Sequence, residues 1–244
     1  MNLTKSLFLS LMTIISIGNM RAQESSQKAP HNFKTEKLKK MNLYPELDRS
    51  IEKILSQQID SSHIESLDKI ASYIRDKQEK KEKTEIIFIC THNSRRSHLA
   101  QIWAQTAAAH YDLKNIKTFS GGTEATAFNF RTVASIERFG FKVENPGGEN
   151  PKYKVSFSEG AEPMTCFSKR YSDTFNPQTN FLAVMVCDHA DEACPVVHGA
   201  EARVSLPFVD PKKSDGTAAE SETYDTRSMQ IALEMYYVMS KVLK

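Results

Sequence analysis

The sequence predicts an α/β fold built on a doubly wound, four-stranded parallel sheet. Segments 86–89 and 181–186 are short, uninterrupted apolar runs, which are typical of strands buried on both faces. Segments with helical spacing of apolar residues alternate with such runs, and this alternation favours parallel strands joined by helices. A Cys-x5-Arg loop, Cys90 to Arg96, follows the first run directly. The four strands are expected at 86–89, 116–119, 181–186 and 203–206.

The helices around this sheet are predicted from apolar residues that recur every three or four positions. Such stripes cover 99–107, 130–139 and 224–243. Trp103 lies in the first of them and is expected in the core, and Gly140 offers a C-terminal cap to the second. Segment 153–166 does not fit the alternation, because it begins like an edge strand or hairpin. We interpret it as an insertion in the sheet.

Length and composition narrow the possible classes of protein. The chain has 244 residues, of which 40% are hydrophobic and 25% are charged, and this is an ordinary globular mixture. Its 32 basic and 30 acidic side chains give a formal charge of +2, which is no electrostatic footprint for nucleic acid. Four cysteines are too few for a disulfide-built scaffold but enough for a reactive site.

The first 22 residues resemble a secretory signal peptide. Lys5 supplies a short positive region, segment 7–17 is apolar, and Ala22 offers a small residue for cleavage. The alternative is a buried core helix. A signal peptide implies export to the periplasm or medium, with no stable membrane insertion after its removal. The expected organisation is therefore a signal peptide (1–22), a polar lead-in and helical extension (23–83) and a catalytic domain (84–244).

Two helices are expected in the extension. The first begins near Pro45, a favourable first-turn residue, and the second begins with a capping box formed by Ser62 and Glu65. Each helix has one apolar face that needs a partner surface, so we expect both to pack on the main domain or on each other. These faces comprise Leu47, Ile51, Ile54 and Leu55, and Ile64, Leu67, Ile70, Ala71 and Ile74.

The most informative segment is the loop that starts at Cys90. It follows a buried strand and opens a helix, so its backbone N–H groups can turn inward and form an anion-binding nest. In open α/β sheets, ligands bind where this loop lies, at the carboxyl ends of the strands. The residues expected to bind the oxyanion are Thr91, His92, Asn93, Ser94, Arg95, Arg96 and Ser97.

Side chains in the loop suit chemistry on an oxyanion. Arg96 offers a planar fork of donors, and the positive surroundings favour the nucleophilic thiolate form of Cys90. Ser97 can donate a hydrogen bond to that thiolate, and Asn93 suits a left-handed loop position. His92 could tune selectivity or simply face solvent. The alternative interpretation is that Cys90 ends a buried strand as a small apolar residue and that both arginines are surface residues.

Segment 86–101, IIFICTHNSRRSHLAQ, resembles the active-site loop of the low-molecular-weight protein tyrosine phosphatase superfamily. That superfamily includes the thioredoxin-coupled arsenate reductases, and the resemblance runs from about residue 84 to the C-terminus. It implies that Cys90 is the nucleophile and that Arg96 binds the oxyanion. It also implies that Ser120 hydrogen-bonds to Asn93 and thereby supports the loop.

The same resemblance assigns a general acid. The superfamily carries an Asp-Pro pair after its fourth strand, and Asp210-Pro211 stands at that place. A carboxylic acid there can protonate an oxygen that leaves the bound oxyanion. The phosphatases usually place an aromatic residue just after this pair, whereas this chain has Lys212 and Lys213. This difference weakens the phosphotyrosine interpretation and is compatible with a small, free oxyanion.

A second cysteine pair, Cys187 and Cys194 in CDHADEACP, resembles the redox segment of those arsenate reductases. The resemblance implies a relay in which Cys187 attacks Cys90, Cys194 attacks Cys187, and a thioredoxin-like dithiol donor reduces the product. Three alternatives stay open: a static Cys187–Cys194 disulfide, a disulfide of either with Cys166, and a metal site. The metal site would use Cys187, His189, Cys194 and His198, although their spacing matches no standard zinc pattern.

The predicted function is the thiol-dependent reduction of arsenate to arsenite. One alternative is a phosphatase that hydrolyses phosphate monoesters through a phosphoryl-Cys90 intermediate. Another is a non-catalytic oxyanion-binding protein whose second cysteine pair is structural. The expected partners are arsenate or phosphate and a dithiol donor, with no nucleic acid. No cofactor or metal is predicted, and Gln101 stands where some arsenate reductases carry an acidic potassium ligand.

Overall fold

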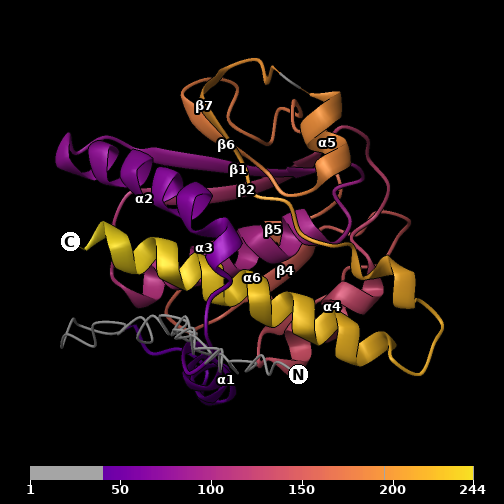
Figure 1. Cartoon of the computed structure of the whole chain (residues 1–244). Helices are drawn as coiled ribbons and strands as arrows, with labels where there is room; N and C mark the ends of the chain where they lie inside the picture. Colours follow the sequence, from indigo (N-terminus) through magenta and orange to yellow (C-terminus); the bar gives the residue numbers. More distant parts are fainter. Residues whose placement is uncertain (1–40, 195, 244) are drawn as a thin grey trace, which may run out of the picture. The chain divides into compact units, whose positions relative to one another are not determined.

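The computed structural model describes residues 41–194 and 196–243, and the predicted signal peptide and the polar lead-in at 23–40 lie outside them. Its main sheet has four parallel strands in the order β2-β1-β6-β7 (Figure 1). These strands are β1 (Thr84–Cys90), β2 (Ile116–Gly122), β6 (Phe181–Met185) and β7 (Ala200–Ser205). The predicted four-stranded parallel α/β fold is confirmed.

Strand β1 lies inside the sheet, with β2 on one side and β6 on the other. All residues from Ile86 to Cys90 are buried, which explains why this segment is apolar without alternation. In register, Cys90 lies opposite Gly122 of β2, and Ile89 lies opposite Met185 of β6. The carboxyl ends of these strands therefore meet at one edge of the sheet, where Cys90 ends β1.

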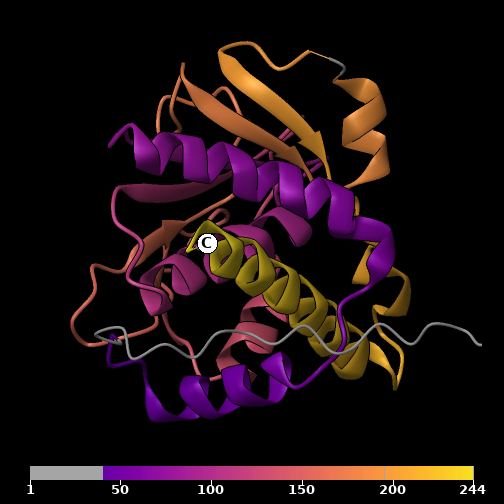
Figure 2. The same ribbon diagram turned by 60° about the vertical axis from the view of Figure 1, so that its left-hand side comes forward.

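Helices α3 (Arg96–His110), α6 (Glu220–Val242) and α2 (Ile64–Glu79) pack together beside the sheet. Helix α6 contacts both α2 and α3, and it can be followed in yellow across Figures 1 and 2. Trp103 is fully buried and its Nε1–H donates to Ser228 Oγ on α6 at 2.9 Å, which confirms its predicted place in the core.

Helix α1 (Pro45–Leu55) and helix α4 (Phe130–Arg138) also pack on α6. The predicted apolar faces of α1 and α2 are buried, apart from partly exposed residues at single positions such as Leu55. Both helices of the extension therefore pack against the catalytic part of the chain, as expected from their amphipathic patterns.

The predicted capping box before α2 is wrong. Asp60 accepts a hydrogen bond from the Ser62 amide at 2.9 Å and starts a 3₁₀ turn, η1 (Ser61–His63), ahead of the helix. Glu65 instead pairs with Lys69 one turn further along α2. An aspartate two residues before Ser62 is an equally good cap, so the sequence pattern did not distinguish the two starts.

The inserted segment forms a second, antiparallel sheet in the order β3-β4-β5. Strands β4 (Tyr153–Ser156) and β5 (Met164–Cys166) are the predicted hairpin, and β3 (Lys142–Glu144) joins them. Cys166 is fully buried in β5, and this burial raises the pKa of its thiol to about 12. Cys166 is therefore a poor nucleophile.

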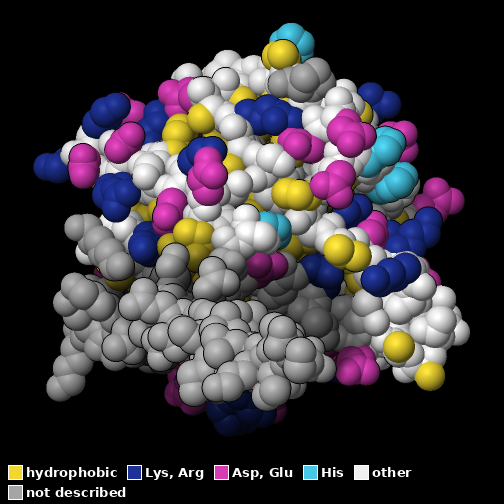
Figure 3. Space-filling view, viewed as in Figure 1, with side chains coloured by type: hydrophobic (Ala, Val, Ile, Leu, Met, Phe, Trp, Pro, Cys, Tyr) yellow, Lys and Arg dark blue, Asp and Glu magenta, His cyan; other side chains and the backbone are white. Residues whose placement is uncertain are grey.

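The described surface carries charges of both signs. On the face shown in Figure 3, basic and acidic side chains are interspersed. Several of them form ion pairs, such as Lys77 with Glu82 at 2.9 Å and Arg138 with Asp225 at 2.7 Å. Among residues 41–194 and 196–243, no helix is both long and apolar enough to cross a membrane.

Candidate active site

The loop between β1 and α3 is held by its carbonyl groups. Surrounding segments donate to the carbonyls of Cys90, Thr91, His92 and Ser94, over distances of 2.8 to 3.1 Å. The donors are the amides of Thr123, Glu124 and Asn129 and the hydroxyl of Ser168. By contrast, the backbone amides of residues 91–95 donate no hydrogen bond to any other group in the described part of the chain. This arrangement leaves a run of N–H groups for an anion, as the nest prediction requires.

Asn93 fixes the turn of the loop. Its φ of 44° is left-handed, as predicted for this position. Its Nδ2 donates to Ser97 Oγ at 2.9 Å, and its Oδ1 accepts from the Lys169 amide at 3.0 Å. The predicted hydrogen bond between Asn93 and Ser120 is wrong, because Ser120 Oγ lies 3.1 Å from His98 Nδ1 instead.

Lys169 and Gly122 support the loop, and sequence reasoning missed both. The Lys169 carbonyl accepts from the Gly122 amide at 2.9 Å, while its buried side chain lies over the Phe167 ring. Burial lowers the pKa of Lys169 to about 8. A Cβ on Gly122 would stand 2.6 Å from the Thr91 carbonyl, so the loop can approach β2 this closely only over a glycine. No local pattern marks Lys169, since it acts through its backbone.

The nucleophile candidate lies at the base of the nest. Cys90 Sγ is 3.1 Å from Ser97 Oγ, and the Cys90 side chain is almost fully buried. The first turn of α3 begins six residues after Cys90, so its N-terminal end also faces this region. The 3.1 Å distance confirms the predicted contact between Ser97 and Cys90.

Arg96 and Asp210 are brought together. Arg96 donates from Nη2 to Asp210 Oδ2 at 2.7 Å and from Nη1 to the Phe208 carbonyl at 2.9 Å. The other oxygen of Asp210 accepts the Lys212 amide at 3.0 Å and caps the 3₁₀ turn η2 (Pro211–Ser214). The oxyanion clamp and the acid candidate therefore share one site at the strand ends.

Arg95, predicted to help bind the oxyanion, directs its guanidinium elsewhere. Its Nε donates to the Tyr224 hydroxyl at 2.8 Å, and its Nη2 lies 3.3 Å from Asp215 Oδ2. Burial and the hydrogen bond to Asp215 raise the pKa of Tyr224 to about 12, so this tyrosine stays neutral. Only the backbone amide of Arg95 is available to an anion in the loop, and its side chain ties the loop to α6.

Cys187 lies beside the loop, although the short helix that follows it, α5 (Asp188–Ala193), was not predicted. Its sulfur caps this helix by accepting from the Ala190 amide at 3.4 Å and lies 3.5 Å from Thr91 Oγ1. The same Thr91 hydroxyl lies 3.3 Å from His189 Nδ1. Cys187 is therefore buried next to the residue that follows Cys90.

Cys194 ends α5 and is partly exposed. All four cysteines are free in this structure, so neither of the static disulfides considered from the sequence is present. No group of three His, Cys, Asp or Glu side chains in the described residues is arranged to hold a metal ion, including the four considered around α5. The geometry of the pair is a buried thiol near Cys90 and a more accessible thiol at the other end of a short helix.

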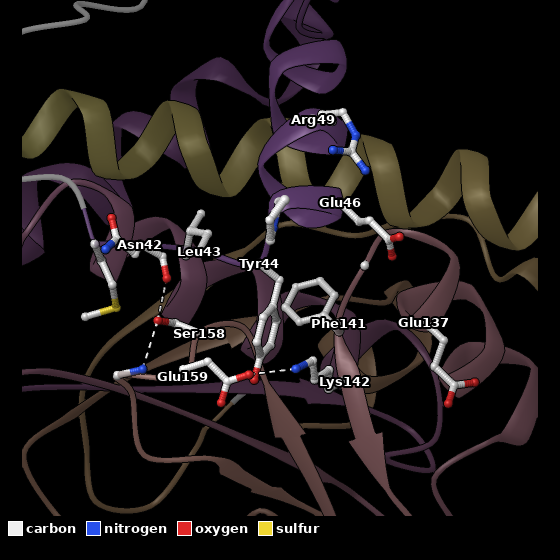
Figure 4. A pocket seen from close by; sticks show the side chains of 14 residues that line it. Asn42, Leu43, Tyr44, Glu46, Arg49, Glu137, Phe141, Lys142, Ser158 and Glu159 are labelled. Atoms are coloured by element: carbon white, nitrogen blue, oxygen red, sulfur yellow. Dashed lines mark hydrogen bonds and ion pairs between the residues drawn. The ribbon is translucent and has the colours of Figure 1, made fainter.

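A cavity of about 850 Å³ lies elsewhere, beside the start of α1 (Figure 4). Tyr44, Phe141 and Lys142 stand on its wall, with the Lys142 ammonium 4.1 Å from the centre of the Tyr44 ring. Lys142 also pairs with Glu159 at 2.7 Å. None of the oxyanion loop, the acid loop or the second cysteine pair lines this cavity, so it is not part of the candidate active site.

Comparison with known proteins agrees with this geometry. No protein-family model matches the sequence. An arsenate reductase of Halalkalibacterium halodurans is 28% identical over 141 residues, which cover 57% of this chain and 81% of the relative. The arsenate reductase of Bacillus subtilis is 27% identical over 142 residues, which cover 58% of this chain and 84% of the relative. Both relatives are matched over most of their own length.

Solved structures give weaker matches. An arsenate reductase from Archaeoglobus fulgidus has a TM-score of 0.42 and 16% identity, covering 63% of this chain and 98% of that one. A low-molecular-weight phosphotyrosine phosphatase from Vibrio cholerae has a TM-score of 0.41 and 16% identity, covering 64% of this chain and 93% of that one.

The sheet order and the Cys-x5-Arg loop at the end of β1 agree with the resemblance to the low-molecular-weight protein tyrosine phosphatase superfamily that the sequence suggested. The curated proteins that this chain resembles are arsenate reductases.

Proposed function

We propose that the protein reduces arsenate to arsenite, with Cys90 as the nucleophile and with Cys187 and Cys194 as its redox relay. The observation that carries this proposal is the position of Cys187, whose sulfur lies 3.5 Å from the hydroxyl of Thr91, directly after Cys90. A phosphatase that relies on water has no use for a second thiol at this place. The names of the curated relatives support the same choice.

The first step is attack by the Cys90 thiolate on arsenic. A sulfur–arsenic bond forms, one arsenate oxygen leaves as water after taking a proton from Asp210, and arsenic remains As(V). The free N–H groups of residues 91–95 and the guanidinium of Arg96 neutralise the charge on the remaining oxygens. The direct contact between Arg96 and Asp210 supports a carboxyl group close to an oxygen of an anion that Arg96 binds.

Replacement of Asp210 by Asn should slow this step by about 10² to 10⁴-fold, the usual contribution of a general acid. Asn keeps the shape of Asp210 and can still cap η2, so the fold should be unchanged. The measurement is the single-turnover rate of adduct formation on Cys90, followed by mass spectrometry. Asp112→Asn is the matched control, because Asp112 is a left-handed residue after α3 that Asn tolerates. A rate within twofold of wild type would show that Asp210 is not the acid.

The second step transfers electrons. The Cys187 thiolate attacks the sulfur of Cys90, the sulfur–arsenic bond breaks, and its electron pair stays on arsenic, which leaves as arsenite. A Cys90–Cys187 disulfide remains. In the third step the Cys194 thiolate attacks Cys187, which releases the Cys90 thiolate and forms a Cys187–Cys194 disulfide. An external dithiol supplies the two electrons that restore the enzyme, and if the predicted export occurs, this donor acts outside the cytoplasm.

The third step requires α5 to open. Seven residues of α-helix span about 10 Å, whereas a disulfide needs Cα atoms within about 7 Å. Arg203 on β7 resists this movement, since its Nη2 donates to the Asp191 carbonyl at 2.7 Å and its Nε donates to the Cys194 carbonyl at 3.1 Å. Arg203 therefore holds the helix in its reduced form.

Replacement of Arg203 by Ala should accelerate formation of the Cys187–Cys194 disulfide by about tenfold, since it removes three charge-assisted hydrogen bonds from a partly exposed position. Stopped-flow thiol titration of the Cys90→Ala protein with an oxidised dithiol follows this disulfide without interference from arsenate. Arg138→Ala, which removes an arginine paired with Asp225, serves as the control. A rate equal to that of the control would mean that Arg203 does not restrain α5.

The alternative function is hydrolysis of phosphate monoesters with the same Cys90, Arg96 and Asp210. It is supported by the acid loop, since the Arg96–Asp210 arrangement suits a phosphoryl-cysteine intermediate as well as an arsenic one. A non-catalytic oxyanion-binding protein is the third possibility. Parallel assays decide among them: arsenite formation with a dithiol supports the reductase, aryl phosphate hydrolysis alone supports the phosphatase, and neither activity supports simple binding.

A further inference from the structure

His63, at the junction of η1 and α2, is tied to the C-terminal helix. Its Nδ1 lies 2.9 and 3.1 Å from the two carboxylate oxygens of Glu234 on α6. The side chain of Glu234 is 1% exposed and that of His63 is 17% exposed. A buried carboxylate requires a partner, and the hydrogen bond to Glu234 raises the pKa of His63. Asp60 also favours the charged imidazole, while Arg227 opposes it.

The same imidazole ring packs edge-on against Phe208. The ring centroids are 5.5 Å apart and the planes meet at 82°. Phe208 is 2% exposed, whereas the next residue, Val209, is 55% exposed. Phe208 is therefore the buried anchor from which the exposed acid loop extends.

The backbone amide and carbonyl of Phe208 both form hydrogen bonds to parts of the candidate active site. Its amide donates to the Val186 carbonyl at 3.2 Å, next to Cys187, and its carbonyl accepts from Arg96 Nη1 at 2.9 Å. Two residues later, the Asp210 carboxylate accepts a hydrogen bond from the other terminal nitrogen, Nη2, of Arg96. A shift of the Phe208 backbone would therefore disturb the Arg96 fork and Asp210 together.

We infer that His63, held by Glu234, is a positioning residue that fixes Phe208 and thereby aims Asp210 and Arg96 at the bound oxyanion. This inference rests on the proposed role of Asp210 as general acid. It gives the N-terminal segment a part in catalysis, although that segment contributes no side chain that touches the substrate.

The test uses two variants of the full chain. His63→Phe keeps an aromatic ring for Phe208 but loses the bond to Glu234. The double variant His63→Ala with Glu234→Gln removes both the ring and the bond without leaving a buried, unpaired carboxylate. Lys69→Ala is the control, because it removes an exposed ion pair from the same helix. Hydrogen exchange of the peptide that covers residues 205–215 reports the order of the acid loop directly.

We expect the double variant to raise exchange in this peptide several-fold relative to the control, while peptides from β1 and α3 keep their protection. His63→Phe should show a smaller increase. Unchanged exchange in residues 205–215 of the double variant would overturn the inference. So would an equal increase in every peptide, since that would indicate general destabilisation. This result does not depend on which oxyanion the enzyme uses.

The second measurement is the rate of adduct formation on Cys90 at saturating arsenate, compared between the variants and the wild-type protein. The double variant should lower the rate about tenfold, a fraction of the full contribution of a general acid. It should also raise the concentration needed for half saturation, because Arg96 binds the oxyanion. In an Asp210→Asn background the same double variant should lower the rate by less, because only the displacement of Arg96 then remains. An additive loss would contradict the positioning role. If Asp210→Asn itself were as fast as wild type, the acid assignment would fail, whereas the exchange result would still report the contact between His63 and Phe208.

Discussion

Replacement of Cys90 by Ser should abolish arsenate reduction and any phosphatase activity, with a loss on the order of 10⁴-fold or more. A serine hydroxyl is a much weaker nucleophile than a cysteine thiol, so no covalent adduct should form at this position. The substitution changes one buried atom, and the carbonyls that hold the loop are untouched. The protein should therefore remain folded and still bind the oxyanion.

Arsenite release and aryl phosphate hydrolysis measure the loss, and phosphate binding by calorimetry measures the retained site. Cys166→Ala is the matched control: it removes another buried thiol, but one in β5 with no part in the loop, and it should keep full activity. Turnover by a folded Cys90→Ser protein would refute every mechanism that places the covalent adduct on Cys90.

Replacement of Cys187 or Cys194 by Ser should stop multiple-turnover arsenate reduction completely, yet leave any aryl phosphate hydrolysis intact. A phosphoryl-cysteine is resolved by water and needs no second thiol, whereas arsenite leaves only when another sulfur attacks Cys90. The two variants should accumulate different species. Cys194→Ser should hold a Cys90–Cys187 disulfide after one turnover, and Cys187→Ser should stop at the arsenic adduct.

Peptide mapping after non-reducing digestion distinguishes these species, with Cys166→Ala again as the control. Sustained arsenite formation by the Cys187→Ser protein would exclude the relay. If the wild-type protein in solution instead held a Cys187–Cys194 disulfide that resists mild dithiols, and if both variants lost thermal stability, the pair would be a structural crosslink. The phosphatase would then be the better interpretation.

The two inner strands of the main sheet could be predicted because they are buried on both faces. Segments 86–89 and 181–186 are apolar at every position, and their burial in β1 and β6 explains why. Strand β3 and helix α5 could not be predicted in the same way. Each is very short, three and six residues respectively, so tertiary contacts rather than local propensity decide its conformation.

In the candidate site, too, contacts between residues close in sequence could be predicted and contacts between distant residues could not. The contact between Cys90 and Ser97 and the left-handed Asn93 follow from a short segment of sequence, and both could be predicted. Lys169 contacts Asn93, which lies 76 positions away in the sequence, and His63 contacts Glu234, which lies 171 positions away. No spacing rule links such distant residues. The expected Ser120–Asn93 bond is absent because the Ser120 hydroxyl contacts His98 instead.

The ion pair between Arg96 and Asp210 has a consequence for how substrate enters. In the free enzyme the guanidinium already has a carboxylate partner, so an arriving dianion meets a neutralised pair rather than a bare cation. An anion that enters must therefore compete with the Asp210 carboxylate for the Arg96 fork.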